Sequence, residues 1–252
     1  MPVGFRGLPV IAARPCAAAC TACRDSCPTG AIHLGRSPRT DPEPATGSDE
    51  QRSSSPSANP QPVSIDLGRC TFCNGCVDVC PEGKIAFTAD PKMGAAERDQ
   101  LVIKEGQLTP PQVRASEAFS RLFGRSLKLR QVSAGGCNAC ELELNAVANV
   151  NFDLQRFGIE WVASPRHADA LIITGPLTRT MRDAIRLAWE ALPEPRFLVA
   201  VGACAISGGL YEGAAGVDRS FLSEVGPSLF VPGCPPHPLT FVNAILDLLG
   251  VP

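Results

Sequence analysis

In the stretch CTFCNGCVDVCP, residues 70–81, the gaps between successive cysteines are two, two and three residues long, and a proline follows the last cysteine. Three cysteines separated by two residues each allow one loop to reach three corners of a cubane iron–sulfur cluster. In chains with two such clusters the fourth cysteine, here Cys80, ligates the other cluster. The stretch therefore predicts a 4Fe–4S cluster with a second cluster beside it.

The same pattern occurs earlier, so this part of the chain is an internal repeat. CAAACTACRDSCPTGAIHL (16–34) aligns with CTFCNGCVDVCPEGKIAF (70–87), and each copy ends in Cys-Pro, a glycine and a short strand-like apolar stretch. The first copy has one extra residue between Cys16 and Cys20. Crossed ligation predicts site 1 on Cys16, Cys20, Cys23 and Cys80, and site 2 on Cys27, Cys70, Cys73 and Cys76.

Zinc is the alternative occupant of these eight cysteines. Structural zinc sites usually use C-x₂-C pairs that are separated by a longer gap. Both runs here are four cysteines long and end in Cys-Pro, so we favour two 4Fe–4S clusters.

Composition suits a globular chain of one large or two ordinary domains, with 252 residues, 44% hydrophobic residues and a net charge of −2. This balance gives no indication of nucleic-acid binding. No run approaches the ~18 apolar residues of a membrane span, and MPVGFRGLPVIAARPC is too short and proline-rich for a signal peptide. We therefore expect a cytoplasmic chain with reduced or metal-bound cysteines, attached to a membrane only through partner subunits.

The chain divides into three segments. Residues 1–104 are expected to form a two-cluster α+β domain with short strands at 63–67 and 84–89. Residues 37–62, rich in proline, serine and acidic residues, are expected to be a flexible insertion. Residues 105–130 are expected to form a link that contains a helix at 113–124, started by Pro110-Pro111.

Residues 131–252 are expected to form a second domain, and around it strands alternate with helices. Strands are predicted at 127–135, 158–164, 168–176 and 196–205, and helices at 140–150, 178–192 and 237–250. Continuous apolar strands that alternate with helices predict an α/β fold, a parallel sheet covered on both faces.

The remaining cysteines lie where these predicted strands end. Cys137 and Cys140 follow Gly135-Gly136 on the turn out of a strand, Cys204 lies just past the strand stretch RFLVAVG (196–202), and Cys234 lies in VPGCPPHP at the mouth of another. That edge is where open α/β sheets build their sites. We expect these four thiols to form site 3, for a third cluster; the alternative is that Cys204 and Cys234 are ordinary buried cysteines.

Four further stretches resemble a known family: GGCNACELEL (135–144), SPRHADALIITGPLT (164–178), VGACAISGG (201–209) and PGCPPHP (232–238). They resemble the small subunit of energy-converting NiFe hydrogenases, a family homologous to the 20-kDa subunit of complex I. The resemblance covers residues 125–250. It implies a flavodoxin-like fold and one proximal 4Fe–4S cluster on Cys137, Cys140, Cys204 and Cys234.

The resemblance also implies a function. The complex I branch carries adjacent cysteines where this chain has Cys137-Asn-Ala-Cys140, so the hydrogenase or formate hydrogenlyase branch is favoured. The N-terminal half resembles two-cluster ferredoxins, here fused to the small subunit. We expect a relay through three 4Fe–4S clusters to a hydrogenase-type large subunit, in a complex with integral membrane subunits on the inner face of the membrane. The alternative is a complex I-like NADH or quinone-linked oxidoreductase.

The chain has no cysteine pairs for nickel, so it is expected not to be catalytic alone. Glu141 could relay protons, but an acid favoured by the helix dipole is the preferred interpretation. Structural or surface roles are expected for the three histidines and for two arginines, His33, His167, His237, Arg166 and Arg179. Four glycines are expected to approach site 3 and donate N–H groups to sulfur, Gly135, Gly136, Gly202 and Gly233. GGLYEG (208–213) follows no nucleotide-binding pattern.

Overall fold

The computed structural model describes residues 1, 4–35, 61–111, 113, 117–124 and 126–251. Apart from its last two residues, the expected insertion at 37–62 lies outside the described residues, as does part of the expected helix at 113–124. The described part of that helix is α3 (Glu117–Phe123).

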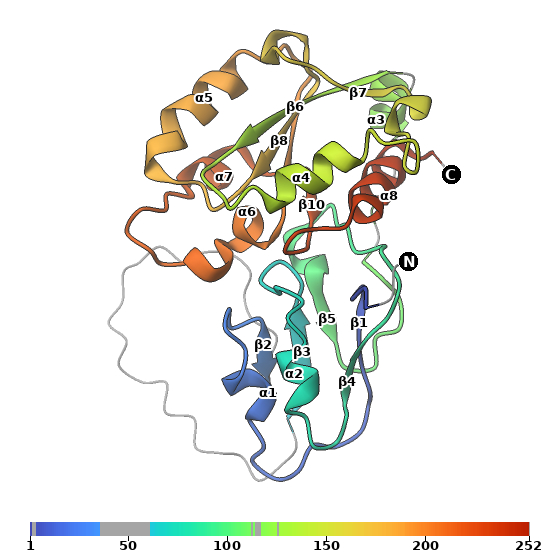
Figure 1. The fold of residues 1–252 in the computed structure, drawn as a ribbon, viewed down its shortest axis with the longest axis vertical. Coiled ribbons are helices and arrows are strands. Elements are labelled where there is room, and N and C mark those ends of the chain that lie inside the picture. Colours follow the sequence, from blue (N-terminus) through green and yellow to red (C-terminus); the bar gives the residue numbers. More distant parts are fainter. Residues whose placement is uncertain (2–3, 36–60, 112, 114–116, 125, 252) are drawn as a thin grey trace.

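The N-terminal half contains two small antiparallel sheets (Figure 1). One has the order β2-β3-β5, and the other pairs β1 with β4. The strands are β1 (Pro9–Ile11), β2 (Ile32–Leu34), β3 (Val63–Asp66), β4 (Ile85–Phe87) and β5 (Val102–Lys104), and the short helices are α1 (Ala22–Asp25), α2 (Gly75–Asp78) and the 3-10 helix η1 (Arg98–Leu101). Since α1 and α2 occupy matching places in the two cysteine runs, the sequence repeat is also a structural repeat.

The C-terminal half is built on a parallel sheet of five strands in the order β10-β9-β8-β6-β7. These strands are β6 (Leu127–Ser133), β7 (Ile159–Trp161), β8 (Ala170–Thr174), β9 (Phe197–Val201) and β10 (Leu229–Val231). In chain order within the sheet this is 2-1-3-4-5, the flavodoxin-like arrangement. The expected doubly wound α/β fold is thereby confirmed, although β6 already begins within the segment expected to be a link.

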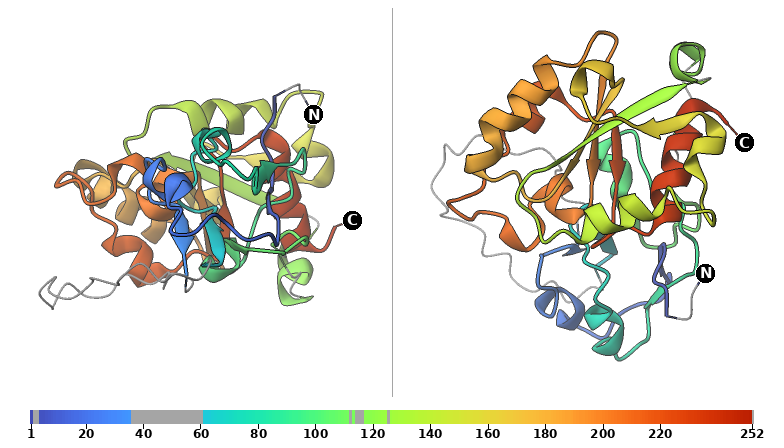
Figure 2. Two further views of the ribbon diagram at one scale, coloured as in Figure 1. Left: turned by 90° about the horizontal axis from the view of Figure 1, so that it is seen from below. Right: turned by 45° about the horizontal axis from the view of Figure 1, so that its top comes forward.

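Helices cover both faces of this sheet (Figure 2). They are α4 (Ala139–Ala146), α5 (Arg182–Glu190), α6 (Ala203–Ser207), α7 (Ser220–Val225) and α8 (Pro238–Leu249), together with 3-10 helices η2 (Leu154–Phe157), η3 (Pro165–His167), η4 (Arg179–Met181) and η5 (Gly209–Tyr211). Alternate residues of β8 separate the two cores. Leu171 and Ile173 pack with α5 and α7, whereas Ala170 and Ile172 pack with α3, α4 and α8.

Several elements are shorter than predicted. The strand expected at 158–164 is limited to three residues, and the helix expected at 140–150 ends at Ala146. The segment after α4 folds back through a turn, in which the Leu154 N–H donates to the Val147 carbonyl. The helix expected at 178–192 begins with the 3-10 turn η4 and continues as α5.

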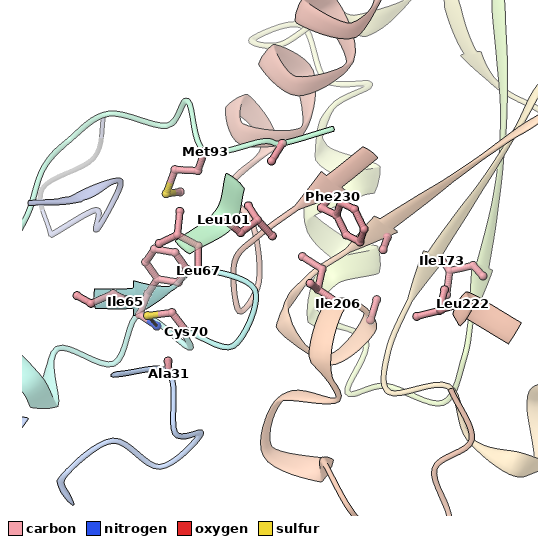
Figure 3. Close-up of a cluster of buried hydrophobic side chains, with 14 of the residues drawn as sticks. Ala31, Ile65, Leu67, Cys70, Met93, Leu101, Ile173, Ile206, Leu222 and Phe230 are labelled. Carbon is pink, nitrogen blue, oxygen red and sulfur yellow. Dashed lines mark hydrogen bonds between the residues drawn. The ribbon is translucent and has the colours of Figure 1, made fainter. Parts of the chain in front are cut away.

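The two halves share one hydrophobic core (Figure 3). Leu67, Cys70 and Leu101 of the N-terminal half belong to the same buried cluster as Ile206 and Phe230 of the C-terminal half. A backbone bridge also joins Ala95 to Phe230, with N–H···O distances of 2.8 and 3.0 Å. The halves are therefore packed together as one body.

Candidate iron–sulfur sites

Site 2 is a small apolar pocket lined by cysteines from both repeats. Cys70, Cys73 and Cys76 come from the loop before and into α2, and Cys27 comes from the end of the first run. The pocket has a volume of about 320 Å³, its open mouth included, and Ile32, Ile65 and Phe87 supply apolar walls. The thiols that were expected to share site 2 are thus brought together.

Site 1 mirrors this arrangement. Its pocket of about 290 Å³, open mouth included, is lined by Cys16, Cys20 and Cys23 of the first run and by Cys80 of the second. The loop of the first run accommodates its extra residue between Cys16 and Ala19. Ala19 (φ +56°) and Phe72 (φ +55°) both have left-handed backbone directly before the second cysteine of their runs.

Backbone N–H groups point at sulfur in both sites. The Ala31 N–H donates to Cys27 Sγ at 3.2 Å, and the Lys84 N–H donates to Cys80 Sγ at 3.3 Å, four residues after the cysteine in each repeat. The Phe72 N–H donates to Cys70 Sγ at 3.3 Å. Such donors stabilise thiolates and lower the charge felt at a bound cluster.

Site 3 lies where the loops after β6, β9 and β10 meet. Cys137 and Cys140 flank the start of α4, Cys204 lies in the first turn of α6, and Cys234 follows β10. A Cβ atom on Gly202 (φ +89°) would lie 2.7 Å from Cys140 Sγ and 3.6 Å from the Gly233 carbonyl oxygen. Only glycine therefore allows these three loops to approach one another here.

Electrostatic interactions between the thiols mostly follow the same three groups, although the Cys76 pKa of site 2 is also raised by Cys23 of site 1. Burial is the main cause that raises the pKa of Cys70 and Cys140, each to about 12. Beyond burial, the Cys70 pKa is raised by the other three thiols of site 2. The Cys140 pKa is raised by Glu141 and then by the other three thiols of site 3. Likewise the Cys23 pKa is raised by burial and by its three site 1 partners.

The thiols of sites 1 and 2 are arranged around a space. In each of these sites the four thiols line one pocket. Four thiols set around a space fit a cubane with one cysteine per iron.

Neither Cys204 nor Cys234 is fully buried, unlike the ordinary buried cysteines of the alternative, and their role as ligands of site 3 stays a prediction. Cys204 is half-buried and Cys234 is exposed. Cys137 is also exposed, so site 3 opens to the surface on one side.

The glycine prediction holds only for the close approach of Gly202 to Cys140 Sγ, and the Gly202 N–H donates to the Val231 carbonyl at 2.8 Å instead of to sulfur. The tight neighbours of Gly135, Gly136 and Gly233 are Thr178, Gly175 and Pro236 respectively. These three glycines serve close backbone packing of the loops. Gly209, which the sequence did not single out, would with a Cβ meet Cys204 Sγ at 3.2 Å.

Glu141 is buried at the start of α4 and accepts a hydrogen bond of 2.6 Å from Thr174 Oγ1, at the end of β8. Burial raises the pKa of Glu141, but hydrogen bonds from Ser133 and Thr174 outweigh it and leave the pKa below its usual range. The carboxylate thus ties α4 to the sheet, which favours the structural interpretation; proton relay stays a prediction.

The other weighed residues take structural or surface positions. His237 is the N-cap of α8, where its Nδ1 accepts from the Leu239 N–H at 3.1 Å. His33 lies half-buried on β2, and burial lowers its pKa. His167, Arg166 and Arg179 are exposed.

Several charged residues near the sites were not identified from the sequence. Lys84 is buried beside site 1 and pairs with Glu105 at 2.8 Å. Asp66, buried at the end of β3, pairs with Arg98. Arg219 donates to carbonyls of α6. No local sequence pattern indicates these contacts, because the two partners in each contact are distant in the chain.

Two family models match the chain. Residues 137–248 match the family described as NADH ubiquinone oxidoreductase, 20 Kd subunit. Residues 15–85 match the 4Fe-4S dicluster domain.

Curated relatives match about half of the chain. The chain is 40% identical over 127 residues to formate hydrogenlyase subunit 7 of Escherichia coli, which is half of each chain. It is 34% identical over 126 residues to the "Probable membrane-bound hydrogenase subunit mbhJ" of Pyrococcus furiosus, half of this chain and 75% of that one. It is 39% identical over 127 residues to NADH-quinone oxidoreductase subunit 6 of Thermus thermophilus, half of this chain and 69% of that one. The chain thus spans only half the length of the E. coli relative.

Proposed function

The chain belongs to the family of the 20-kDa subunit of NADH:ubiquinone oxidoreductase, and from that membership we propose that it relays electrons through three 4Fe–4S clusters to or from the active site of a hydrogenase-type partner subunit. The observation that carries the proposal is the presence, in one packed body, of a two-pocket ferredoxin unit and a strand-edge thiol site.

The proposal assigns all twelve cysteines. Site 1 uses Cys16, Cys20, Cys23 and Cys80, site 2 uses Cys27, Cys70, Cys73 and Cys76, and site 3 uses Cys137, Cys140, Cys204 and Cys234. The domain division at 1–104, 105–130 and 131–252 belongs to the same proposal. It is supported by antiparallel strands that all precede residue 105 and by a parallel sheet that begins at Leu127.

When bound, a 4Fe–4S cluster supplies one-electron oxidation and reduction. The protein residues do the rest. The thiolates would hold the irons, the N–H groups of Ala31 and Lys84 would stabilise negative charge on sulfur, and Ile65 and Phe87 line site 2 with apolar surface. Because site 1 and site 2 share cysteines from both runs, neither can move independently of the other.

The proposed partner subunit and the proposed location of the chain rest on the relatives and on the exposed side of site 3. The exposure of Cys137 and Cys234 leaves one side of site 3 for a large subunit to cover. No helix in the described part of the chain is long and apolar enough to cross a membrane. We therefore propose peripheral attachment to the inner face of the membrane, through partner subunits with membrane spans.

The first test counts clusters and then removes one. Anaerobically purified protein should contain about twelve iron and twelve sulfide ions per chain; four or eight would remove one or two clusters from the proposal. Cys204→Ser should lose about four irons and stop turnover of the assembled complex, while Ser223→Ala, an exposed change on α7, should leave both unchanged. Full turnover in Cys204→Ser would rule the relay out.

A complex I-like function is the second candidate, because the chain is as similar to the Thermus NADH-quinone oxidoreductase subunit as to the hydrogenase-related proteins. The purified complex discriminates between them. Hydrogen evolution or uptake supports the hydrogenase-type assignment, and quinone-dependent oxidation without hydrogen turnover supports the alternative.

A further inference from the structure

Arg219 directs its guanidinium at the backbone of the helix that carries Cys204. Its Nη1 donates to the Cys204 and Ala205 carbonyls at 3.1 and 2.9 Å, and its Nη2 donates to the Ile206 carbonyl at 2.5 Å. The last carbonyls of a helix have no partner inside it, and α6 is only five residues long. One side chain therefore satisfies most of the free end of this helix.

The positive charge of Arg219 lies against the helix that carries Cys204. A guanidinium is always protonated in proteins, and its three hydrogen bonds hold it at the α6 carbonyls. Among the described residues Arg219 has no ion pair within 4.0 Å, so its charge is directed at the carbonyls.

The same helix is held from the N-terminal half. Gly68 lies so close to α6 that an added Cβ would contact Ile206 at 2.7 Å, and Arg69 pairs with Glu212 just beyond η5. Since Gly68 and Arg69 directly precede Cys70, the site 2 loop packs on the helix of site 3. Any shift of α6 would change how site 3 sits against site 2.

We propose that Arg219 is a positioning residue of site 3, which fixes Cys204 through the α6 carbonyls and sets a permanent positive charge that raises the reduction potential of the third cluster. This inference rests on the proposed third cluster. The physical reason is that reduction adds a negative charge, which a nearby buried cation stabilises more strongly than solvent does.

The test compares three variants in the full, cluster-loaded chain by redox titration followed with EPR. Arg219→Gln removes the charge and most of the contacts. Arg219→Lys keeps the charge but cannot reach three carbonyls at once. Arg186→Gln is the control, since it removes an arginine that pairs with Glu224 of α7 and touches no cysteine-bearing element.

We expect Arg219→Gln to lower the potential of the third cluster alone, so that at fixed poise its ratio of reduced to oxidised cluster falls about tenfold, or about 59 mV for one electron. Chelators should also extract its iron faster. Arg219→Lys should keep the potential near that of the wild type and show only the faster extraction. Arg186→Gln should match the wild type, and the signals of sites 1 and 2 should not change.

An unchanged potential and extraction rate for the third cluster in Arg219→Gln would overturn the inference. If Arg219→Gln yields no folded protein, Arg219→Lys decides: wild-type extraction refutes the positioning role, and faster extraction supports it. A wild-type chain with only two clusters would instead refute the proposed function, so the two failures are distinguishable.

Discussion

Replacing Asp66 with asparagine should destabilise the whole molecule, because this buried carboxylate neutralises a largely buried arginine where the two halves meet. Asp66 is 1% exposed. Its two oxygens accept from Arg98 Nη1 and Nη2 at 2.7 and 2.6 Å, and Oδ1 also accepts from the Gly68 N–H at 2.8 Å. Arg69 adds a weaker contact at 3.6 Å.

The expected loss of stability depends on which contacts of Asp66 an asparagine can still make. Its carbonyl oxygen still accepts from Gly68, but the bidentate pair is lost and Arg98 stays largely buried with an uncompensated charge. Breaking one side of a buried ion pair costs about 3–5 kcal/mol. Because the Arg98 side chain is 17% exposed and can regain some water, we expect the lower end, about 3 kcal/mol. In a chain of this size that lowers the melting temperature by roughly 6–12 °C.

The assay is thermal unfolding of the cluster-loaded chain, followed by circular dichroism at equal iron content. Glu224→Gln is the matched control, since the Arg186–Glu224 pair has side chains 39% and 49% exposed and should contribute only about 0–1 kcal/mol. If Asp66→Asn melts within about 1 °C of Glu224→Gln, at most half of the 2–4 °C expected per kcal/mol, the assigned role of the buried pair is refuted.

Three further predictions concern single sites. Lys84→Met leaves Glu105 without its partner beside site 1 and should cost about 3 kcal/mol, measured as a lower melting temperature; equal stability would contradict a buried, paired lysine. Gly202→Ala places a Cβ 2.7 Å from Cys140 Sγ at a backbone φ of +89°, so the variant should lose about four of its twelve irons. Gly216→Ala is the control, because its Cβ would meet nothing within 4 Å and the variant should lose no iron. Iron analysis of the two purified variants tests this prediction. In the cluster-free chain, burial raises the pKa of Cys70 and Cys140 from 9.0 to about 12. Between pH 9 and pH 12 the unfolded chain therefore loses thiol protons that the folded chain keeps. The stability of the cluster-free chain should therefore fall as pH rises from about 9 towards 12, and a urea midpoint that is flat or rising over this range would contradict the assignment.

Local spacing was enough to predict sites 1 and 2. The ligands of each run lie within a dozen residues, so the chain can bend around a cluster with few other requirements. Even the crossed partners Cys27 and Cys80 could be predicted, because the repeat imposes the same path twice. The short strands β1 and β5 were not predicted, since three residues are too few to show an alternating pattern.

Site 3 could be predicted only in outline. The apolar strands β8 and β9 indicate a parallel sheet, and its C-terminal edge gathers Cys137, Cys204 and Cys234. The resemblance to a family supplied the rest. The sequence did not indicate that Gly202 brings three loops together, that Gly209 contacts Cys204, or that Gly135 and Gly136 serve packing instead of a cluster.

The twelve cysteines, their repeat and the alternation of strands and helices determined by themselves the kind of cofactor and the two kinds of fold, because ligand spacing and hydrophobic period are properties of short stretches. Tertiary structure alone decided how the two halves share one core, and which charges lie near each site. Asp66–Arg98, Lys84–Glu105 and the contacts of Arg219 with α6 depend on burial, and burial arises only when segments far apart in the chain pack against one another.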